Sequence, residues 1–471
     1  MASTMINSDK GSKLYLGGLT FVAVLGGLLF GYDTAVISGA EKALEAFFSQ
    51  STDFIYSKGW HGITASSALI GCVIGGAISG LLAPRWGRRN SLIFASMLFF
   101  LSAIGSWRPE MLFFEFGKPS FSLLLTFNAY RVLGGIGVGL ASAICPMYIA
   151  EVSPANVRGR LVSVNQFAII FGMLVVYFVN YLIRINLPGN IEQAMMEIGW
   201  RRMFLSEAFP AATFGLLLLF VPKTPRYLVM SGNEQKALNV LTRINGLLPA
   251  QKILNEIKET VIEKREKLFS YGVAVVVIGI LLSFFQQAVG INVVLYYAPR
   301  IFENLGASGD VSMRQTVVMG VVNIIFTMVA ILTVDKFGRK PLLIIGSIGM
   351  MVGMAALSVL SFMDVIGVAA LVFIIIYTAS FMMSWGPITW VLISEIFPNT
   401  IRGQAVAIAV AAQWISNFIV SSTFPSLSEW STGGAYLIYA VFSLLSAVFV
   451  FKMVPETKGK TLEDMTRLWR K

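Results

Sequence analysis

Arg85-Trp86-Gly87-Arg88-Arg89 is a short basic motif, and Glu151-Val152-Ser153-Pro154-Ala155-Asn156-Val157-Arg158-Gly159 follows it further along the chain. Both motifs recur in the same order as Asp335-Lys336-Phe337-Gly338-Arg339-Lys340 and Glu395-Ile396-Phe397-Pro398-Asn399-Thr400-Ile401-Arg402-Gly403. Each half then closes on a similar run, Pro222-Lys223-Thr224-Pro225-Arg226 or Pro455-Glu456-Thr457-Lys458-Gly459. A long repeat between apolar stretches is typical of a duplicated transporter half and not of a solenoid.

The composition indicates an integral membrane protein. The 471 residues are 56% hydrophobic and only 13% charged, and the mean hydropathy is +0.74. A soluble domain carries about 25% charged residues, so this chain has too few charges to cover a water-facing surface. Cys72 and Cys145 both lie in apolar segments, where we expect small core residues rather than a disulfide.

Twelve apolar stretches are long enough to span a bilayer, which needs about 20 residues. They lie roughly at 14–38, 62–83, 90–107, 122–150, 159–184, 203–221, 270–303, 312–334, 341–363, 365–394, 402–425 and 433–453. The first stretch has full spanning length and no small-residue cleavage site, which favours a retained span over a signal peptide. We therefore expect six-helix bundles at 1–221 and 270–454, a cytoplasmic helical linker at 222–269 and a cytoplasmic tail at 455–471.

Basic residues gather on one predicted side of the membrane. The loops after even-numbered spans, the central segment and the C-terminus hold most of the Lys and Arg, whereas the opposite loops are acidic or mixed. The positive-inside rule then places both termini in the cytoplasm. The net charge of +11 is explained by this topology, so no nucleic-acid partner is expected. Charges of alternating sign among Leu and Ile at 225–265 predict amphipathic linker helices; a regulatory docking platform is the alternative.

Amide side chains inside apolar spans suggest a sugar site. They are Gln166, Gln286, Gln287, Asn292, Asn323 and Gln413. An amide offers two donors and two acceptor lone pairs, which matches hydroxyl groups that both donate and accept. Trp390 and Trp414 can cover the C–H faces of a sugar, and Tyr296 adds a hydroxyl. The alternatives are hydrogen bonds between helices for the amides and simple packing for the tryptophans.

Asp33 lies deep in the first span, where an unpaired carboxylate would cost several kcal/mol. Burial favours the neutral carboxyl and a nearby cation favours the charged one, and Arg131 in the fourth span is the natural cation. A carboxyl that changes protonation as this partner approaches or leaves can couple protons to transport. The alternative is a permanent ion pair between spans one and four. Glu207 in the sixth span is a second buried acid, and His61, the only histidine, is expected in an outer loop.

The repeated motifs, together with Phe284-Phe285-Gln286-Gln287-Ala288-Val289-Gly290-Ile291-Asn292, resemble the sugar porter family of the major facilitator superfamily over essentially the whole chain. The stretches 165–172, 290–299 and 411–414 are most similar to its bacterial xylose–proton symporters. The resemblance implies an all-α integral membrane fold of twelve transmembrane helices in two six-helix bundles. It assigns proton coupling to the pair of Asp33 and Arg131. It implies sugar contacts at Gln166, Gln286, Gln287, Asn292, Trp390 and Gln413, with Tyr296, Asn323, Gly386 and Trp414 in addition.

The repeated motifs are also expected to form a cytoplasmic gate, in which basic residues pair with Glu151 and Glu395; binding of lipid headgroups is the alternative. The gate residues are Arg85, Arg88, Arg89, Glu151, Arg158, Asp335, Arg339, Lys340, Glu395 and Arg402. Two positions depart from the family pattern. Pro84 stands where the family usually has an acid, and Lys223 stands where it favours Glu. Both departures affect the charge network of this gate and not the sugar site.

The expected function is import of D-xylose with protons across a bacterial inner membrane, without a cofactor or a metal. Alternatives are a symporter for glucose, galactose or arabinose, an uncoupled facilitator, and a non-transporting sugar sensor, although the short tail of about 18 residues disfavours a sensor. The sequence has no metal cluster, nucleophile–base pair or phosphate loop that would indicate an enzyme. Gly134-Gly135-Ile136-Gly137-Val138-Gly139 lacks the spacing and the preceding strand of a nucleotide loop, so close helix packing is expected there.

Overall fold

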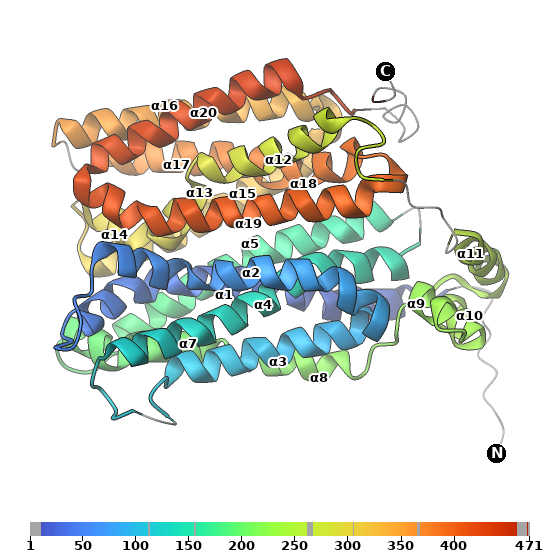
Figure 1. Cartoon of the computed structure of the whole chain (residues 1–471), viewed down its shortest axis with the longest axis horizontal. Helices are drawn as coiled ribbons and strands as arrows, with labels where there is room; N and C mark the ends of the chain where they lie inside the picture. The colour runs from blue at the N-terminus through green and yellow to red at the C-terminus, as the bar shows by residue number, and fades with distance from the viewer. Residues whose placement is uncertain are drawn as a thin grey trace.

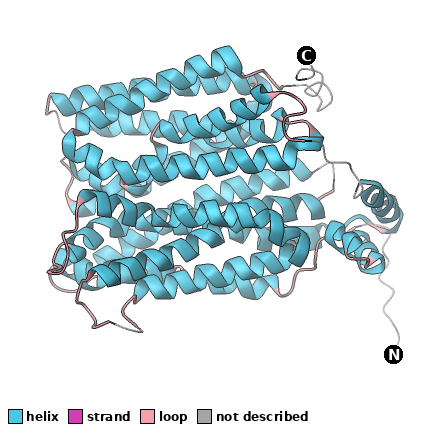
Figure 2. Ribbon diagram, viewed as in Figure 1, coloured by secondary structure: helices cyan, strands magenta, loops and turns pink. Residues whose placement is uncertain are grey.

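The computed structural model describes residues 11–111, 114–154, 157–260, 267–304, 306–364, 368–458 and 469. Within these ranges the regular structure is entirely helical (Figure 2). Helices of the first half form the lower layer of Figure 1 and helices of the second half the upper layer, while the helices at 225–260 project from one end. The predicted all-α membrane architecture is confirmed.

The first half contains five long helices and a sixth, interrupted one. The long helices are α1 (Lys13–Phe48), α2 (Lys58–Trp86), α3 (Arg88–Trp107), α4 (Phe121–Val152) and α5 (Arg158–Ile185). The interrupted helix consists of α6 (Ile191–Ala194), the π-helix η1 (Met195–Gly199), α7 (Trp200–Ser206) and α8 (Ala208–Leu218). Eleven helical segments of the described chain are long and apolar enough to cross a membrane. The sixth predicted span, at 203–221, is not among these eleven segments. It corresponds to α7 and α8, which meet at Glu207.

The second half also contains interrupted helices. Its elements are α12 (Val273–Ala288), α13 (Ile291–Tyr296), α14 (Ala298–Asn304), α15 (Gly309–Phe337), α16 (Arg339–Phe362), α17 (Val368–Met382), α18 (Trp385–Ile396), α19 (Asn399–Trp430) and α20 (Thr432–Met453). The predicted span 270–303 is divided into α12, α13 and α14. The first break is at Gly290, where φ is +90°, a backbone conformation that side chains other than Gly adopt only with strain. Discontinuous helices in transporters supply polar backbone groups at the membrane midplane.

Glycines let helices of the first half approach closely. A Cβ atom at Gly135 would lie 1.7 Å from the Ala68 carbonyl oxygen, and one at Gly139 would lie 2.4 Å from that of Cys72. The backbones of α2 and α4 therefore touch along this stripe. This is the packing role predicted for Gly134 to Gly139.

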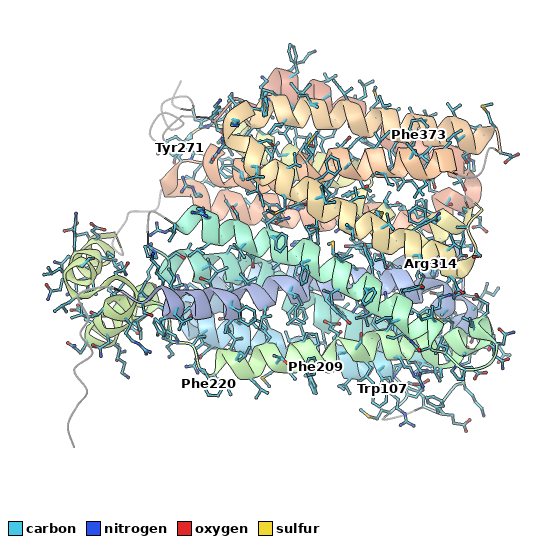
Figure 3. All side chains as sticks on the ribbon, turned by 180° about the vertical axis from the view of Figure 1, so that it is seen from behind. Trp107, Phe209, Phe220, Tyr271, Arg314 and Phe373 are labelled. Atoms are coloured by element: carbon cyan, nitrogen blue, oxygen red, sulfur yellow. The ribbon has the colours of Figure 1, made fainter. Side chains whose placement is uncertain are left out.

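The outer surface of the bundle is apolar. Phe209 and Phe220 are 79% and 83% exposed and project away from the first half (Figure 3). Such side chains are stable on a transmembrane surface because lipid solvates them.

The linker helices are α9 (Pro225–Met230), α10 (Glu234–Asn245) and α11 (Leu247–Thr260). They lie beyond one end of the bundle (Figure 1), which we call the linker end; the other is the far end. Helix α10 buries Ala237, Val240, Leu241 and Ile244 and is amphipathic, as predicted. It also holds the start of α1, because the Ser12 N–H donates to the Arg243 carbonyl at 2.9 Å.

Candidate functional site

Four amide side chains form one buried cluster in the second half. Gln413 Nε2 on α19 donates to Gln286 Oε1 at 2.5 Å, and Gln287 Nε2 donates to the same oxygen at 3.2 Å. Asn292 Nδ2 on α13 donates to Gln287 Oε1 at 2.5 Å. The break at Gly290 allows this geometry, because it turns α13 so that Asn292 faces the end of α12. The structure thus brings together four of the residues predicted to contact sugar.

The cluster is anchored to the interrupted helix of the tenth span. Gln286 Nε2 donates to the carbonyl oxygens of Trp385 at 3.0 Å and Gly386 at 3.3 Å. Both carbonyls belong to the first turn of α18, which begins at Trp385 after α17 ends at Met382. Gly386 therefore contributes its backbone to the cluster.

Several buried polar atoms of the predicted sugar-site residues have no hydrogen-bond partner in the described part of the chain. They include Gln413 Oε1, Asn323 Oδ1 and Trp414 Nε1, on side chains that are at most 5% exposed. A buried polar group without a partner costs free energy, so a hydroxyl-rich ligand that supplied partners would be stabilised here. The Trp414 ring lies 5.6 Å from that of Phe30 on α1, so the first half contacts the cluster region.

The remaining predicted sugar-site residues are less closely linked to the cluster. Gln166 on α5 and Trp390 on α18 are half-buried, and the described contacts include no hydrogen bond from either to the amide cluster. The Tyr296 hydroxyl accepts from Asn417 Nδ2 at 3.4 Å, and Ser421 Oγ donates to Asn417 Oδ1 at 2.9 Å. Asn417 was not predicted from the sequence, although it lies one helical turn after Gln413, where it shares the same face.

Asp33 and Arg131 form a buried ion pair. Arg131 Nη1 lies 2.5 Å from Asp33 Oδ1, and the two side chains are 2% and 0% exposed. Arg131 Nη2 also donates to the Asp33 backbone carbonyl at 3.0 Å, and its guanidinium lies 5.0 Å from the Phe204 ring centroid. The second carboxylate oxygen of Asp33 has no hydrogen-bond partner among the described residues.

Glu207 lies at the break between α7 and α8 and is fully buried. Neither of its carboxylate oxygens has a hydrogen-bond partner in the described residues, and the charges of Asp33 and Arg131 act on it. Two acids and one Arg therefore share this part of the first half.

In each half the repeated motifs form an ion pair at the linker end. Arg88 Nη2 lies 2.6 Å from Glu151 Oε1, and Arg339 Nη2 lies 3.0 Å from Glu395 Oε1. Thr457 Oγ1 donates to the other oxygen of Glu395 at 2.6 Å. Each described pair joins helices of the same half, so neither links the two halves in this structure.

The other predicted gate residues have varied environments. Arg89 donates to the carbonyls of Leu218 and Leu219, at the end of α8. Lys340 Nζ donates to the Phe451 carbonyl at 2.8 Å, and Arg402 donates to that of Phe397. Arg85 and Arg158 are exposed. The side chain of Asp335 lies outside the described residues.

At the far end several ion pairs join the two halves. Arg300 on α14 binds Glu41 on α1, with Nη2 2.6 Å from Oε2, and it also pairs with Glu45. Lys42 of α1 pairs with Glu303 of α14, and Arg184 of α5 lies 2.8 Å from Asp310 of α15. Ion pairs therefore connect the two halves at the far end, whereas each described pair of the repeated motifs at the linker end lies within one half.

Two sequence expectations about the far end were wrong. His61 does not lie in a loop: it is 1% exposed, near the start of α2, and its Nε2 lies 2.8 Å from Glu41 Oε2. Glu41 and Glu45 belong to α1, which continues to Phe48, beyond the predicted end of the first span at 38. These three side chains could in principle hold a metal ion. The guanidinium of Arg300 already binds both carboxylates, however, and a second cation beside it would be repelled.

Comparison with known proteins gives the family. The family described as "Sugar (and other) transporter" matches residues 19–469. The chain belongs to this family. It is 49% identical to the D-xylose-proton symporter of Escherichia coli strain K12, over 97% of this chain and 96% of that protein. It is 39% identical to the glucose facilitated diffusion protein of Zymomonas mobilis, over 98% of this chain and 99% of that protein.

A solved structure of the E. coli xylose transporter XylE, in a partially occluded inward open conformation, superposes with a TM-score of 0.87 at 48% identity, covering 95% of this chain and 100% of that one. The chain is thus a multi-pass transporter of the bacterial inner membrane and not an enzyme. The predicted major facilitator fold is confirmed by this match.

Proposed function

We propose that this transporter imports D-xylose together with protons by alternating access. The observation that carries the proposal is the buried amide cluster, whose neighbouring polar atoms lack partners. A neutral, hydroxyl-rich sugar matches these amides, and the E. coli symporter, 49% identical to this chain, is a D-xylose–proton symporter by name. Gln286, Gln287, Asn292 and Gln413 would bind the hydroxyls. Gln166, Trp390, Trp414, Tyr296, Asn323 and the backbone at Gly386 would complete the site.

Proton coupling is proposed for Asp33 and Arg131, with Glu207 as an accessory acid. The pair is desolvated, so a change in the distance between its members would change the affinity of Asp33 for a proton. A proton on Asp33 would release Arg131, which also contacts Phe204 of the interrupted sixth span. In this way protonation would bias the packing of α1, α4 and α7.

The membrane orientation and domain motion are also proposed. Most basic loop residues lie at the linker end, so this end would face the cytoplasm, and both termini would lie there. Residues 1–221 and 270–454 would rock against each other around the sugar, with 222–269 as a cytoplasmic linker and 455–471 as a tail. The ion pairs of the repeated motifs would then hold helix ends together within each half while the cytoplasmic side is open.

An uncoupled facilitator is the second candidate, because the chain is also 39% identical to a glucose facilitated diffusion protein. The test is uptake of labelled xylose, glucose, galactose and arabinose into proteoliposomes, with and without an imposed proton gradient. Accumulation of xylose above its outside concentration is expected only with the gradient. Equilibration without accumulation would favour the facilitator, and binding without uptake would favour a sensor.

A further inference from the structure

The far end of the molecule contains a charge cluster that crosses from one half to the other. Glu41 is fully buried, and its carboxylate accepts from Arg300 Nε at 2.9 Å and Nη2 at 2.6 Å. His61 completes its coordination, with Nε2 2.8 Å from Glu41 Oε2 and Nδ1 3.2 Å from the Tyr56 hydroxyl. Glu41, Tyr56 and His61 belong to the first half, whereas Arg300 belongs to α14 of the second.

We propose that this cluster is an electrostatic latch that holds the far end closed, with Arg300 as its central residue. The proposal rests on the alternating-access function given above. The latch consists of Arg300, Glu41, Glu45 and His61. These residues fix the position of one half relative to the other, and none of them belongs to the proposed sugar site.

Burial explains why Arg300 is central. A carboxylate without water is stable only when it is paired, and the guanidinium of Arg300 pairs with Glu41. Glu41 and Glu45 are four residues apart on α1, so their charges are neighbours on one helix face. When the halves separate at this end, Arg300 leaves with α14. Of the described contacts, Glu41 then keeps only that with His61, while Glu45 keeps its pair with Lys58. Opening therefore requires water to replace the guanidinium.

Two further ion pairs, which are more exposed than the Arg300–Glu41 pair, reinforce the latch. Lys42–Glu303 has side chains 48% and 22% exposed, and Asp310 of the Arg184–Asp310 pair is 44% exposed. Solvent and salt screen such pairs, so they contribute less than the buried pair. Glu303 lies on α14 with Arg300, so one short helix carries both contacts.

Backbone contacts at the same end agree with a closed state. The Tyr177 hydroxyl of α5 donates to the Leu295 carbonyl of α13 at 3.0 Å. A Cβ at Gly62 of α2 would lie 1.8 Å from the Ser422 carbonyl of α19. The helix that carries Arg300 follows directly on α13, after the break at Gly290, and can move with it. Arg300 of the latch and Asn292 of the sugar site thus lie on the consecutive helices α14 and α13 of the seventh span.

The test is Arg300→Gln, measured by spin-label distances at both ends of the protein. Labels at Ile55 and Trp430, which are 89% and 72% exposed, report the far end. Labels at Arg160 and Phe337, both exposed, report the linker end. The native cysteines Cys72 and Cys145 are buried, so replacing them with Ala restricts labelling to the introduced sites. We expect the far-end distance to lengthen and the linker-end distance to shorten, because the whole carrier shifts toward the state open at the far end.

Arg201→Gln is the matched control. Arg201 forms an equally buried pair with Glu110 in the same half, with exposures of 3% and 2%, so its loss should lower stability and leave both distances unchanged. Unchanged distances in Arg300→Gln, or the same changes in Arg201→Gln, would overturn the latch. A longer far-end distance without a shorter linker-end distance would also overturn it, since that result indicates local loosening only. If Arg300→Gln does not fold, Glu303→Gln breaks the exposed pair and should give a smaller shift in the same direction.

Transport kinetics separate this inference from the proposed function. In Arg300→Gln a larger fraction of the carriers should be open at the far end and able to bind xylose from outside. The outside xylose concentration for half-maximal uptake should therefore fall several-fold. Arg300→Lys retains the charge and should restore most of the wild-type value. Wild-type protein that fails to accumulate xylose would refute the proposed function but would leave the distance test of the latch intact.

Discussion

At the scale of single residues, Gln286 holds the amide cluster together. It donates to two backbone carbonyls of the tenth span and accepts from Gln287 and Gln413. We expect Gln286→Ala to weaken xylose binding several-fold to tenfold, because each buried hydrogen bond is worth about 0.5–1.5 kcal/mol. Trp390→Ala should also weaken binding, through loss of a stacking face. Isothermal titration calorimetry measures both effects, and Asn239→Ala on the linker helix α10 serves as a control outside the bundle. Wild-type affinity in both variants would remove these two residues from the site.

At the scale of elements, the break between α12 and α13 places the sugar-site amides. Gly290 has φ +90°, and a Cβ there would lie 2.7 Å from the Tyr439 ring. We expect Gly290→Ala to cost about 1–2 kcal/mol for the backbone alone, plus displacement of Tyr439, and to weaken xylose binding by moving Asn292. Gly272→Ala is the control, because Gly272 has φ +86° but open space around it. Thermal unfolding should show both variants destabilised, and calorimetry should show weaker binding only for Gly290→Ala. Equal affinities would mean that the break does not position the site.

At the scale of the whole molecule, apolar stretches and repeated motifs were sufficient to predict the membrane fold, because lipid requires long apolar helices whatever their neighbours are. The helix breaks at Glu207 and Gly290 were not predicted, since both stretches are apolar enough to read as continuous spans. The ion pairs at the far end were also missed: His61, Glu41 and Arg300 are far apart in sequence, and only the packing of α1, α2 and α14 brings them together. The amides that we propose as sugar contacts could be selected from the sequence alone, because a polar side chain inside an apolar span is unusual wherever it lies.

The coupling of sugar transport to protons depends on whether Asp33 carries the proton. Asp33→Asn mimics the protonated carboxyl in shape, so this variant should still bind xylose and should still exchange labelled for unlabelled sugar. It should lose accumulation against a gradient, because the side chain can no longer gain and release a proton in each cycle. Arg131 would keep its bond to the Asp33 backbone carbonyl but lose its counter-charge. Breaking a buried pair costs about 3–5 kcal/mol, so stability should fall.

Proteoliposome assays of exchange and of gradient-driven uptake, run on the same preparation, separate binding from coupling in this variant. Glu207→Gln is the comparison, since Glu207 is equally buried but has no described hydrogen-bond partner, and we expect it to retain part of the accumulation. A well-folded Asp33→Asn protein that accumulates xylose at the wild-type level would refute the assignment. If Glu207→Gln alone abolished accumulation, the proton site would lie at the break in the sixth span, and the Asp33–Arg131 pair would be a permanent link between α1 and α4.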